Sequence, residues 1–191
     1  MMFWSLLFCG TLLAAVQGQC PDDLADLPNA AFSASAGCIW ADSDESHRFD
    51  NYEEATARCR EVFGPEGRLI EIQNAEDQEL AVQVMREAEA MFSLGEPELS
   101  YWWSGLRDDD DDGDWVWSGS NTPLTYSNWH PAAVPEANLF NCMQFLSGTV
   151  YEGRGGAGEN VLVTNETNLG QWMTYNCYDD FLNTHALCQL K

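Results

Sequence analysis

The segment Trp102–Gly119, WWSGLRDDDDDGDWVWSG, places four tryptophans and a Gly-Leu pair around an unbroken run of aspartates, Asp108–Asp112. Trp115, Val116 and Trp117 alternate as the residues of a strand do, and a glycine stands on either side of them. The segment therefore predicts a buried aromatic platform directly beside an acidic loop. The aspartate run has two interpretations, a solvated turn next to a core strand or a binding site for a cation.

The composition predicts one globular domain with a strong negative charge. The chain has 191 residues, of which 45% are hydrophobic and 12% aromatic, enough for one substantial core. Asp and Glu number 31 against 8 Lys and Arg, so the formal net charge is −23. Such a field repels phosphate backbones and anionic lipid, which argues against nucleic acid and membrane-surface partners. Cations, cationic proteins and mineral surfaces stay possible.

Residues 1–18, MMFWSLLFCGTLLAAVQG, form an apolar run that ends in small residues. The run lacks the usual positive start, but it is too short for a comfortable membrane span and nothing later in the chain supplies one. It predicts a secretory signal peptide cleaved before Gln19. We therefore expect a secreted, extracellular protein with no insertion into a membrane.

Cleavage would remove Cys9 and leave an even set of six cysteines, which in a secreted chain indicates disulfides. Zinc binding is the alternative use of cysteine. It is disfavoured because no C-x-x-C pair occurs and no two of the six lie closer than eleven positions. The residues alone leave the pairing open. The six are Cys20, Cys38, Cys59, Cys142, Cys177 and Cys188.

Two amphipathic helices are predicted in the first half of the chain. The first follows a capping Asp50 with Glu53 three residues on, and the second starts at Asn74 with an acid at Asp77. Their expected buried faces are Tyr52, Ala55, Cys59 and Val62 for the first helix, and Leu80, Val84, Ala88 and Met91 for the second.

The remaining segments predict an extended arm, strands and one long loop. Residues 19–37 form the arm, and helices precede most of the strands, so the expected class is α+β with a mostly antiparallel sheet. The Gly-rich loop 147–170 carries the sequon Asn165-Glu166-Thr167, where glycosylation is plausible. The expected strands are Arg68–Ile72, Tyr101–Leu106, Asp114–Trp117, Asn128–Trp129, Cys142–Leu146, Val161–Val163 and His185–Gln189.

Taken together, these features resemble the C-type lectin-like domain family. The resemblance rests on a cysteine-bearing first helix, an acid-capped second helix, WWSGL, G-x-W-x-W, N-W, a cysteine before a strand, W-x-x-x-x-C and a terminal ALCQ. It runs from about Cys38 to Lys191, so the expected domain is 38–191. The family implies two helices, mostly antiparallel sheets, a long irregular loop region and three disulfides. The implied pairs are Cys20 with Cys38, Cys59 with Cys188, and Cys142 with Cys177.

In sugar-binding members of this family, a loop reading Glu-Pro-Asn or Gln-Pro-Asp and an Asn-Asp pair after the late tryptophan hold a calcium ion that also binds the sugar. The corresponding residues here are Val134-Pro135-Glu136 and Met173-Thr174. Calcium needs six to eight oxygen ligands, and Val134 and Met173 offer no side-chain oxygen. The resemblance therefore implies that the usual sugar-coordinating calcium site is not assembled.

The family's auxiliary calcium site is matched in part. Asp108 and Asp112 stand at two of its acidic positions, and Asn141 supplies one amide oxygen just before Cys142. A calcium ion bound there is one interpretation. A solvated acidic loop is the other, because a flexible run offers its oxygens only loosely.

The expected function is recognition of a glycan or protein ligand in host defence or another extracellular setting, through the face around Trp129, Glu136, Asn138 and the loop 147–170. The alternative is an acidic matrix or mineral-interacting protein that uses the fold as a carrier of carboxylates. Catalysis is not expected, because no hydrolase, zinc-protease or P-loop motif occurs. The three histidines, His47, His130 and His185, lie in unlike surroundings.

Overall fold

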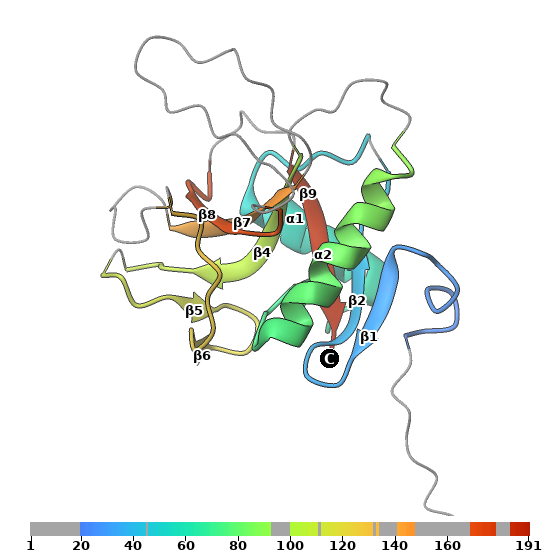
Figure 1. Cartoon of the computed structure of the whole chain (residues 1–191), viewed down its shortest axis with the longest axis horizontal. Helices are drawn as coiled ribbons and strands as arrows, with labels where there is room; N and C mark the ends of the chain where they lie inside the picture. Colours follow the sequence, from blue (N-terminus) through green and yellow to red (C-terminus); the bar gives the residue numbers. More distant parts are fainter. Residues whose placement is uncertain are drawn as a thin grey trace, which may run out of the picture.

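The computed structural model describes residues 20–44, 46–92, 100–110, 112–131, 133, 141–147, 169–178 and 184–191 (Figure 1). Several sequence predictions fall outside these ranges. They are the signal peptide, the Val134–Glu136 loop, Asn138, the strand Val161–Val163 and the sequon at Asn165.

The described part is α+β, as predicted. The helices are α1 (Tyr52–Phe63) and α2 (Ala75–Glu89). The strands are β1 (Ala30–Ser33), β2 (Gly37–Ala41), β3 (Arg68–Leu69), β4 (Ser100–Arg107), β5 (Val116–Trp117), β6 (Thr122–Pro123), β7 (Cys142–Ser147), β8 (Trp172–Tyr175) and β9 (Thr184–Leu190).

The strands form one connected sheet around β9. The main path runs β1-β2-β9-β4-β5-β6, with β3 on β9, and with β7 joining β4 and β8. All pairs are antiparallel except β4 with β9, which are parallel. The mostly antiparallel prediction is thus confirmed. The parallel pair places the Trp102 and Trp103 segment against the C-terminal strand, in the middle of the molecule.

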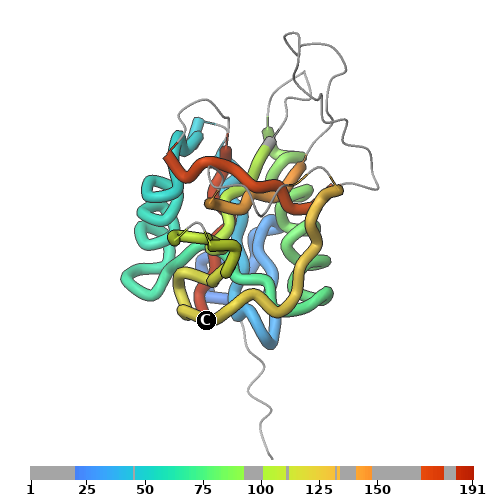
Figure 2. The backbone as a smooth tube through the Cα atoms, turned by 90° about the vertical axis from the view of Figure 1, so that its left-hand side faces the viewer, coloured from blue at the N-terminus to red at the C-terminus, as the bar shows by residue number. Residues whose placement is uncertain are grey.

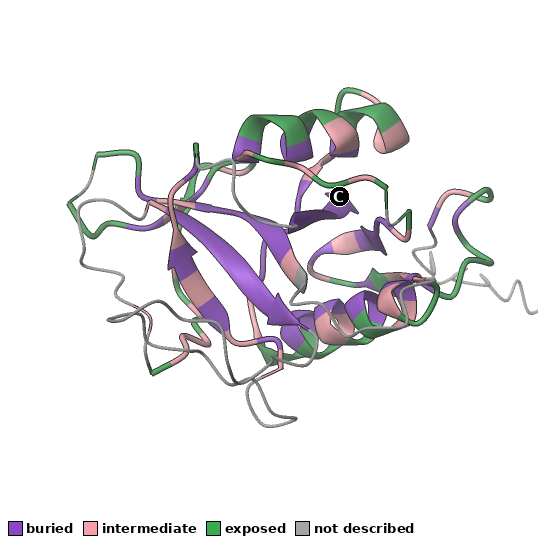
Figure 3. Cartoon of the chain, turned by 90° about the horizontal axis from the view of Figure 1, so that it is seen from above, coloured by how far each residue is buried: buried purple, intermediate pink, exposed green. Residues whose placement is uncertain are grey.

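The two helices cover opposite faces of the central strands, α2 in front and α1 behind in Figure 1. Alternation along β4 and β9 supplies both faces, because successive side chains of a strand point to opposite sides. Trp102 and Leu187 lie in the core under α2, whereas Trp103 and Cys188 lie in the core under α1. Figure 3 shows the result, with each helix buried on its inner side and exposed on its outer side.

The cap of α1 differs by one residue from the prediction. Asn51, not Asp50, is the N-cap, and its side chain accepts a hydrogen bond from the Glu54 backbone N–H at 3.0 Å. Asp50 instead donates its backbone N–H to the Glu54 carboxylate at 3.3 Å. Both residue types form good caps, so local sequence could not separate two neighbouring candidates.

The cap of α2 is Asn74, as predicted, and it accepts from the Asp77 backbone N–H at 3.0 Å. Asp77 is fully buried and has a second role, because one carboxylate oxygen accepts from the hydroxyls of Ser33 and Ser35, each at 2.5 Å. This contact ties the turn after β1 to the start of α2. The second half of the predicted arm, residues 19–37, belongs to the sheet because β1 pairs with β2.

The predicted buried face of α2 is correct at Val84 and Ala88 and wrong at its end. Met91 lies beyond the helix and is 41% exposed. The buried positions that the pattern missed are Asp77, Gln78, Ala81 and Met85. In α1, Tyr52, Ala55 and Cys59 are buried, whereas Val62 is half-buried.

Predicted and observed strands also differ. The strand expected over Asn128–Trp129 is only an isolated bridge, in which Trp129 pairs with Trp172. The strand expected over Arg68–Ile72 ends at Leu69, after which the Ile70 N–H bonds to Leu187 and the Ile70 carbonyl accepts from Gly105. This connection is buried because it runs between β9 and β4. β6 was not predicted, since two exposed residues, Thr122 and Pro123, carry no strand pattern.

Three disulfides link the described chain in the pairs implied by the family resemblance. Cys20 joins Cys38 and Cys142 joins Cys177, while Cys59 of α1 joins Cys188 of β9 across 129 positions. The Cys20–Cys38 bond fastens the arm to β2. The long-range Cys59–Cys188 bond fixes α1 against the C-terminal strand.

Candidate functional site

Trp129 stands at the surface end of a cluster of aromatic rings. It is half-buried, and its ring centre lies 5.1 Å from that of Trp115 and 5.5 Å from that of Trp172, both edge-on. Backbone hydrogen bonds fix the segment, because the Trp172 N–H donates to Asn128 and the His130 N–H donates to Trp172, each at 2.9 Å. The indole is thus held rigidly, partly in solvent, above the core. Glu136 and Asn138, the other predicted ligand residues, lie outside the described ranges.

The two residues after Trp172 belong to β8 and face its partner strand. Met173 pairs with Gln144 of β7, and Thr174 pairs with Met143. Met173 is half-buried and Thr174 is 5% exposed. In the described half of the family's sugar-coordinating site, neither of the two positions directly after this tryptophan carries a carboxylate or amide side chain, so the residues present do not fit that calcium ion.

The acidic loop after β4 is built around Asp108. This residue is only 6% exposed, and its carboxylate accepts the backbone N–H groups of Asp112 at 3.2 Å and Gly113 at 2.9 Å. Gly113 has a positive φ of 86°, a conformation that glycine adopts without steric cost. The Asp108 N–H also donates to the Asn141 carbonyl at 3.0 Å. The structure therefore brings Asp108 near the predicted metal residues Asp112 and Asn141, through contacts that shape the loop.

The next aspartate is neutralised locally. Asp109 pairs with Arg107 at 2.5 Å, and the Arg107 guanidinium lies over the Tyr52 ring at 4.7 Å from its centre. Asp110, Asp112 and Asp114 are exposed. Within the described ranges, no three Asp, Glu, His or Cys side chains gather as the ligands of one metal ion would. The described residues thus form an ordered acidic loop and do not complete a calcium cage.

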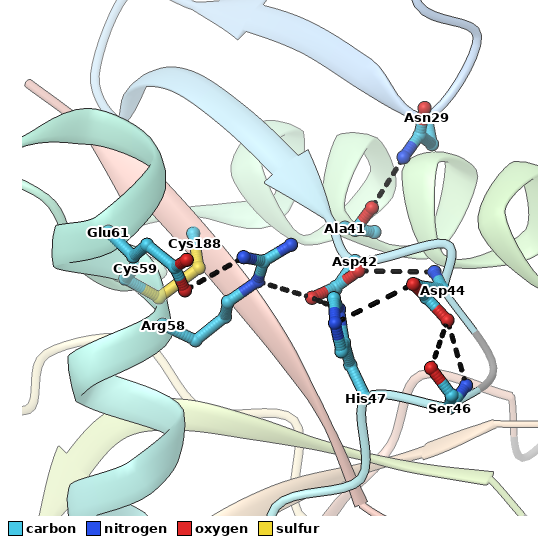
Figure 4. A network of polar contacts seen from close by, with 10 residues as sticks. All are labelled: Asn29, Ala41, Asp42, Asp44, Ser46, His47, Arg58, Cys59, Glu61 and Cys188. Atoms are coloured by element: carbon cyan, nitrogen blue, oxygen red, sulfur yellow. Dashed lines mark hydrogen bonds and ion pairs between the residues drawn. A yellow bond between two sulfur atoms is a disulfide. The ribbon is translucent and has the colours of Figure 1, made fainter.

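An ion-pair network around the buried Asp42 was not anticipated from the sequence (Figure 4). Asp42 is 1% exposed, and one of its oxygens accepts from Arg58 Nε at 2.7 Å and contacts His47 Nδ1 at 3.1 Å. The Asp44 N–H donates to the other oxygen at 3.1 Å. The network joins the loop after β2 to α1 one residue before Cys59, which indicates a structural role. No periodic signal marks Asp42 as buried in an acidic stretch of sequence.

His185 is buried between aromatic rings. It is 3% exposed, and its ring is stacked at 4.7 Å on Phe92 and tilted at 5.0 Å from Trp102. Burial lowers the pKa of His185 from 6.5 to about 4, so the ring is neutral at neutral pH. Nearby, the Glu89 carboxylate accepts from Trp102 Nε1 at 3.1 Å, and burial raises the pKa of Glu89. These groups belong to the packing between α2, β4 and β9.

Neither helix of the described chain has the length and apolar character that crossing a membrane requires. A comparison with curated proteins matches a Perlucin-like protein of Mytilus galloprovincialis, 28% identical over 102 residues. That match covers 53% of this chain and 59% of the relative, so the chain spans under two thirds of the relative's length.

Solved structures share the fold. Human lithostathine aligns with a TM-score of 0.60 and 17% identity, covering 96% of this chain and 99% of that chain. Ovocleidin-17 of Gallus gallus aligns with a TM-score of 0.55 and 18% identity, covering 85% of this chain and 96% of that chain. The family model described as the lectin C-type domain matches residues 49–189. This chain therefore belongs to the C-type lectin domain family.

Proposed function

We propose that this protein is a secreted recognition protein whose C-type lectin domain binds a glycan or a protein ligand without the calcium-coordinated monosaccharide site of its family. The observation that carries the proposal is the pair Met173-Thr174 in β8, where an oxygen-rich calcium pair would be needed. Binding in this protein would then depend on shape, aromatic contact and hydrogen bonds.

The surface around Trp129 suits such binding. An indole held half-exposed by Trp115 and Trp172 is a rigid, amphipathic contact that loses little entropy when a ligand covers it. Secretion is supported by the three disulfides, since such bonds persist in oxidising compartments. Binding is favoured over catalysis because His185 is 3% exposed and so has little access to a substrate.

A glycan array probed with and without chelator tests this function, together with affinity capture of extracellular proteins. We expect binding that chelator leaves unchanged and that Trp129→Ala weakens at least tenfold. The matched control is Tyr178→Ala, which removes a ring that is 67% exposed at the surface. If no glycan and no protein binds under either condition, the proposal is wrong.

The charge of the chain favours a second candidate, an acidic protein of a mineralised matrix. The net charge is −23, and Asp110, Asp112 and Asp114 stand exposed on one ordered loop. A dense field of carboxylates attracts divalent ions diffusely, even without a cage. Ovocleidin-17, which has the same fold, is described as a major protein of an eggshell calcified layer, so the fold is compatible with such a setting.

Crystal growth of calcium carbonate separates the two candidates. A matrix protein should change growth rate or crystal shape at micromolar concentration, and neutralising the exposed aspartates to asparagine should remove the effect. A recognition domain should give the same growth rate and crystal shape as bovine serum albumin, an acidic protein that serves as the control.

A further inference from the structure

A groove lies along the outer side of α2, beside the segment that leads into Trp129. It encloses about 580 Å³ between the helix and the segments that contain Asn128 and Leu169. Figure 2 shows the chain after β6 running beside this helix. The volume falls within the range of small-molecule sites, about 300–1,000 Å³. The lining residues are Gln78, Glu79, Val82, Gln83, Arg86, Glu87, Asn128 and Leu169.

The wall of the groove is held in place by buried contacts. Gln78 is 6% exposed, accepts from Trp172 Nε1 at 2.7 Å and donates to the Gly170 carbonyl at 2.8 Å. Gly170 has a positive φ of 78°, and a Cβ there would stand 2.2 Å from a methyl carbon of Val82. The 169–170 segment therefore lies as close to α2 as a backbone can. A groove with such walls exists before any ligand arrives.

The helix side of the groove carries polar groups that can still form hydrogen bonds or ion pairs with a ligand. Glu79 and Arg86 are exposed and form no ion pair within the described part of the chain. Gln83 donates to the Glu87 carboxylate at 3.1 Å, which leaves the Gln83 carbonyl and the second Glu87 oxygen to accept other donors. Val82 and Leu169 add apolar surface to the same groove.

We propose that this groove binds a neutral, hydroxyl-rich ligand, a short neutral oligosaccharide, without calcium. Neighbouring hydroxyls can donate to the oxygens of Gln83 and Glu87 while accepting from the Arg86 guanidinium. The apolar surface of Val82 and Leu169 would cover the C–H side of a sugar ring. Two carboxylates against one guanidinium, in a chain of charge −23, disfavour an anionic ligand.

This inference deepens the proposed function by naming a ligand class and a second location for it, and it stands or falls separately from the Trp129 face. The test uses the secreted chain in chelator and measures binding of chitotetraose, cellotetraose and mannotetraose by NMR titration and calorimetry. Gln83→Ala with Arg86→Ala is the groove variant. The matched control is Arg60→Ala, an exposed arginine in the last turn of α1.

We expect at least one tetrasaccharide to bind, the groove variant to lose tenfold or more in affinity, and Arg60→Ala to bind as the wild type does. Because the substituted side chains are exposed, the groove variant should keep the wild-type Tm, which confirms that it folds. If a sugar binds but only Trp129→Ala weakens it, the groove inference is overturned and the proposed function survives. Binding of a lysine-rich octapeptide in the groove with no sugar bound, or no binding of any tetrasaccharide, also overturns the inference.

Discussion

His185 lies 3% exposed between the rings of Phe92 and Trp102, and burial lowers its pKa from 6.5 to about 4. Asp42 and a hydrogen bond with the backbone of His47 favour its charged form, whereas the charges of Arg48 and His47 disfavour it. Above pH 6.5 neither the folded nor the unfolded state carries the proton. As the pH falls from 6.5 to 4 the unfolded state binds it first, so stability is lost over that window.

The loss from His185 should reach about 3 kcal/mol by pH 4, at about 1.4 kcal/mol per unit of pKa shift. We predict that His185→Leu loses less free energy of unfolding than the wild type between pH 7 and 4, by up to that amount. Urea unfolding at both pH values measures it. His130→Gln, in the loop beside Trp129, is the control, and equal acid losses in the wild type and His185→Leu would contradict the prediction.

Asp108 is a residue whose role the sequence suggested and the structure refines. Its type and position match a calcium ligand of the family, but its oxygens accept two backbone N–H groups of its own loop. Which of these uses applies depends on the turn made by Asp112 and Gly113, and a run of identical aspartates does not specify that turn. The sequence therefore singles out Asp108 without predicting its contacts.

We predict that Asp108→Asn lowers the free energy of unfolding by about 1–2 kcal/mol, because a charged acceptor of two partly buried hydrogen bonds is lost. Calcium should raise the Tm of the wild type only slightly. A complete cage at 100 times its Kd would add about 2.7 kcal/mol, a rise of about 5–10 °C for a chain of this size. Scanning calorimetry with calcium and with chelator measures both, and a rise of that size, abolished by Asp108→Asn with Asp112→Asn, would contradict us.

At the scale of elements, the patterns that could be read from sequence are those that one element carries by itself. The periodicity of α1 and α2, the aromatic strands β4 and β5 and the terminal β9 follow from local alternation. β1 and β6 carry no such alternation, and they are recognised as strands only by their pairing with β2 and β5. The α2 groove could not be predicted either. In the sequence, Gln83 and Arg86 have the pattern of a solvated helix face, and the groove depends on the 169–170 segment, which is distant in the chain.

The turn between β1 and β2 gives a prediction for an element. Gly37 has a φ of 81°, and a Cβ there would stand 2.2 Å from the Leu190 carbonyl oxygen of β9. Gly64, after α1, has a similar φ of 77° with open space around it. Gly37→Ala should therefore lose at least about 1 kcal/mol more than Gly64→Ala, since it adds an overlap with backbone to the torsional strain. Equal losses in urea unfolding would show that the hairpin moves away from β9 at no cost.

At the scale of the whole molecule, the opposing faces of β9 join two cores into one unit. Leu187 packs into the core under α2, and Ala186 and Cys188 pack into the core under α1. The Cys59–Cys188 disulfide fastens α1 to this strand at the fully buried end of the second core. Loss of this bond should therefore affect both cores, whereas loss of the Cys20–Cys38 bond frees only the arm and β1.

The two disulfides should differ in their contribution to stability, because the contribution grows with the logarithm of the length of chain that the bond closes. By the chain-entropy relation, the 129-position loop of Cys59–Cys188 gives about 5 kcal/mol and the 18-position loop of Cys20–Cys38 about 3 kcal/mol. We predict that Cys59→Ala with Cys188→Ala unfolds at lower urea concentration than Cys20→Ala with Cys38→Ala. The longer bond also lies where both partners are fully buried, so its removal adds a packing loss. If the variant without the Cys20–Cys38 bond is the less stable one, the arm is part of the core and not an attachment to it, and the entropic ranking is wrong for this chain.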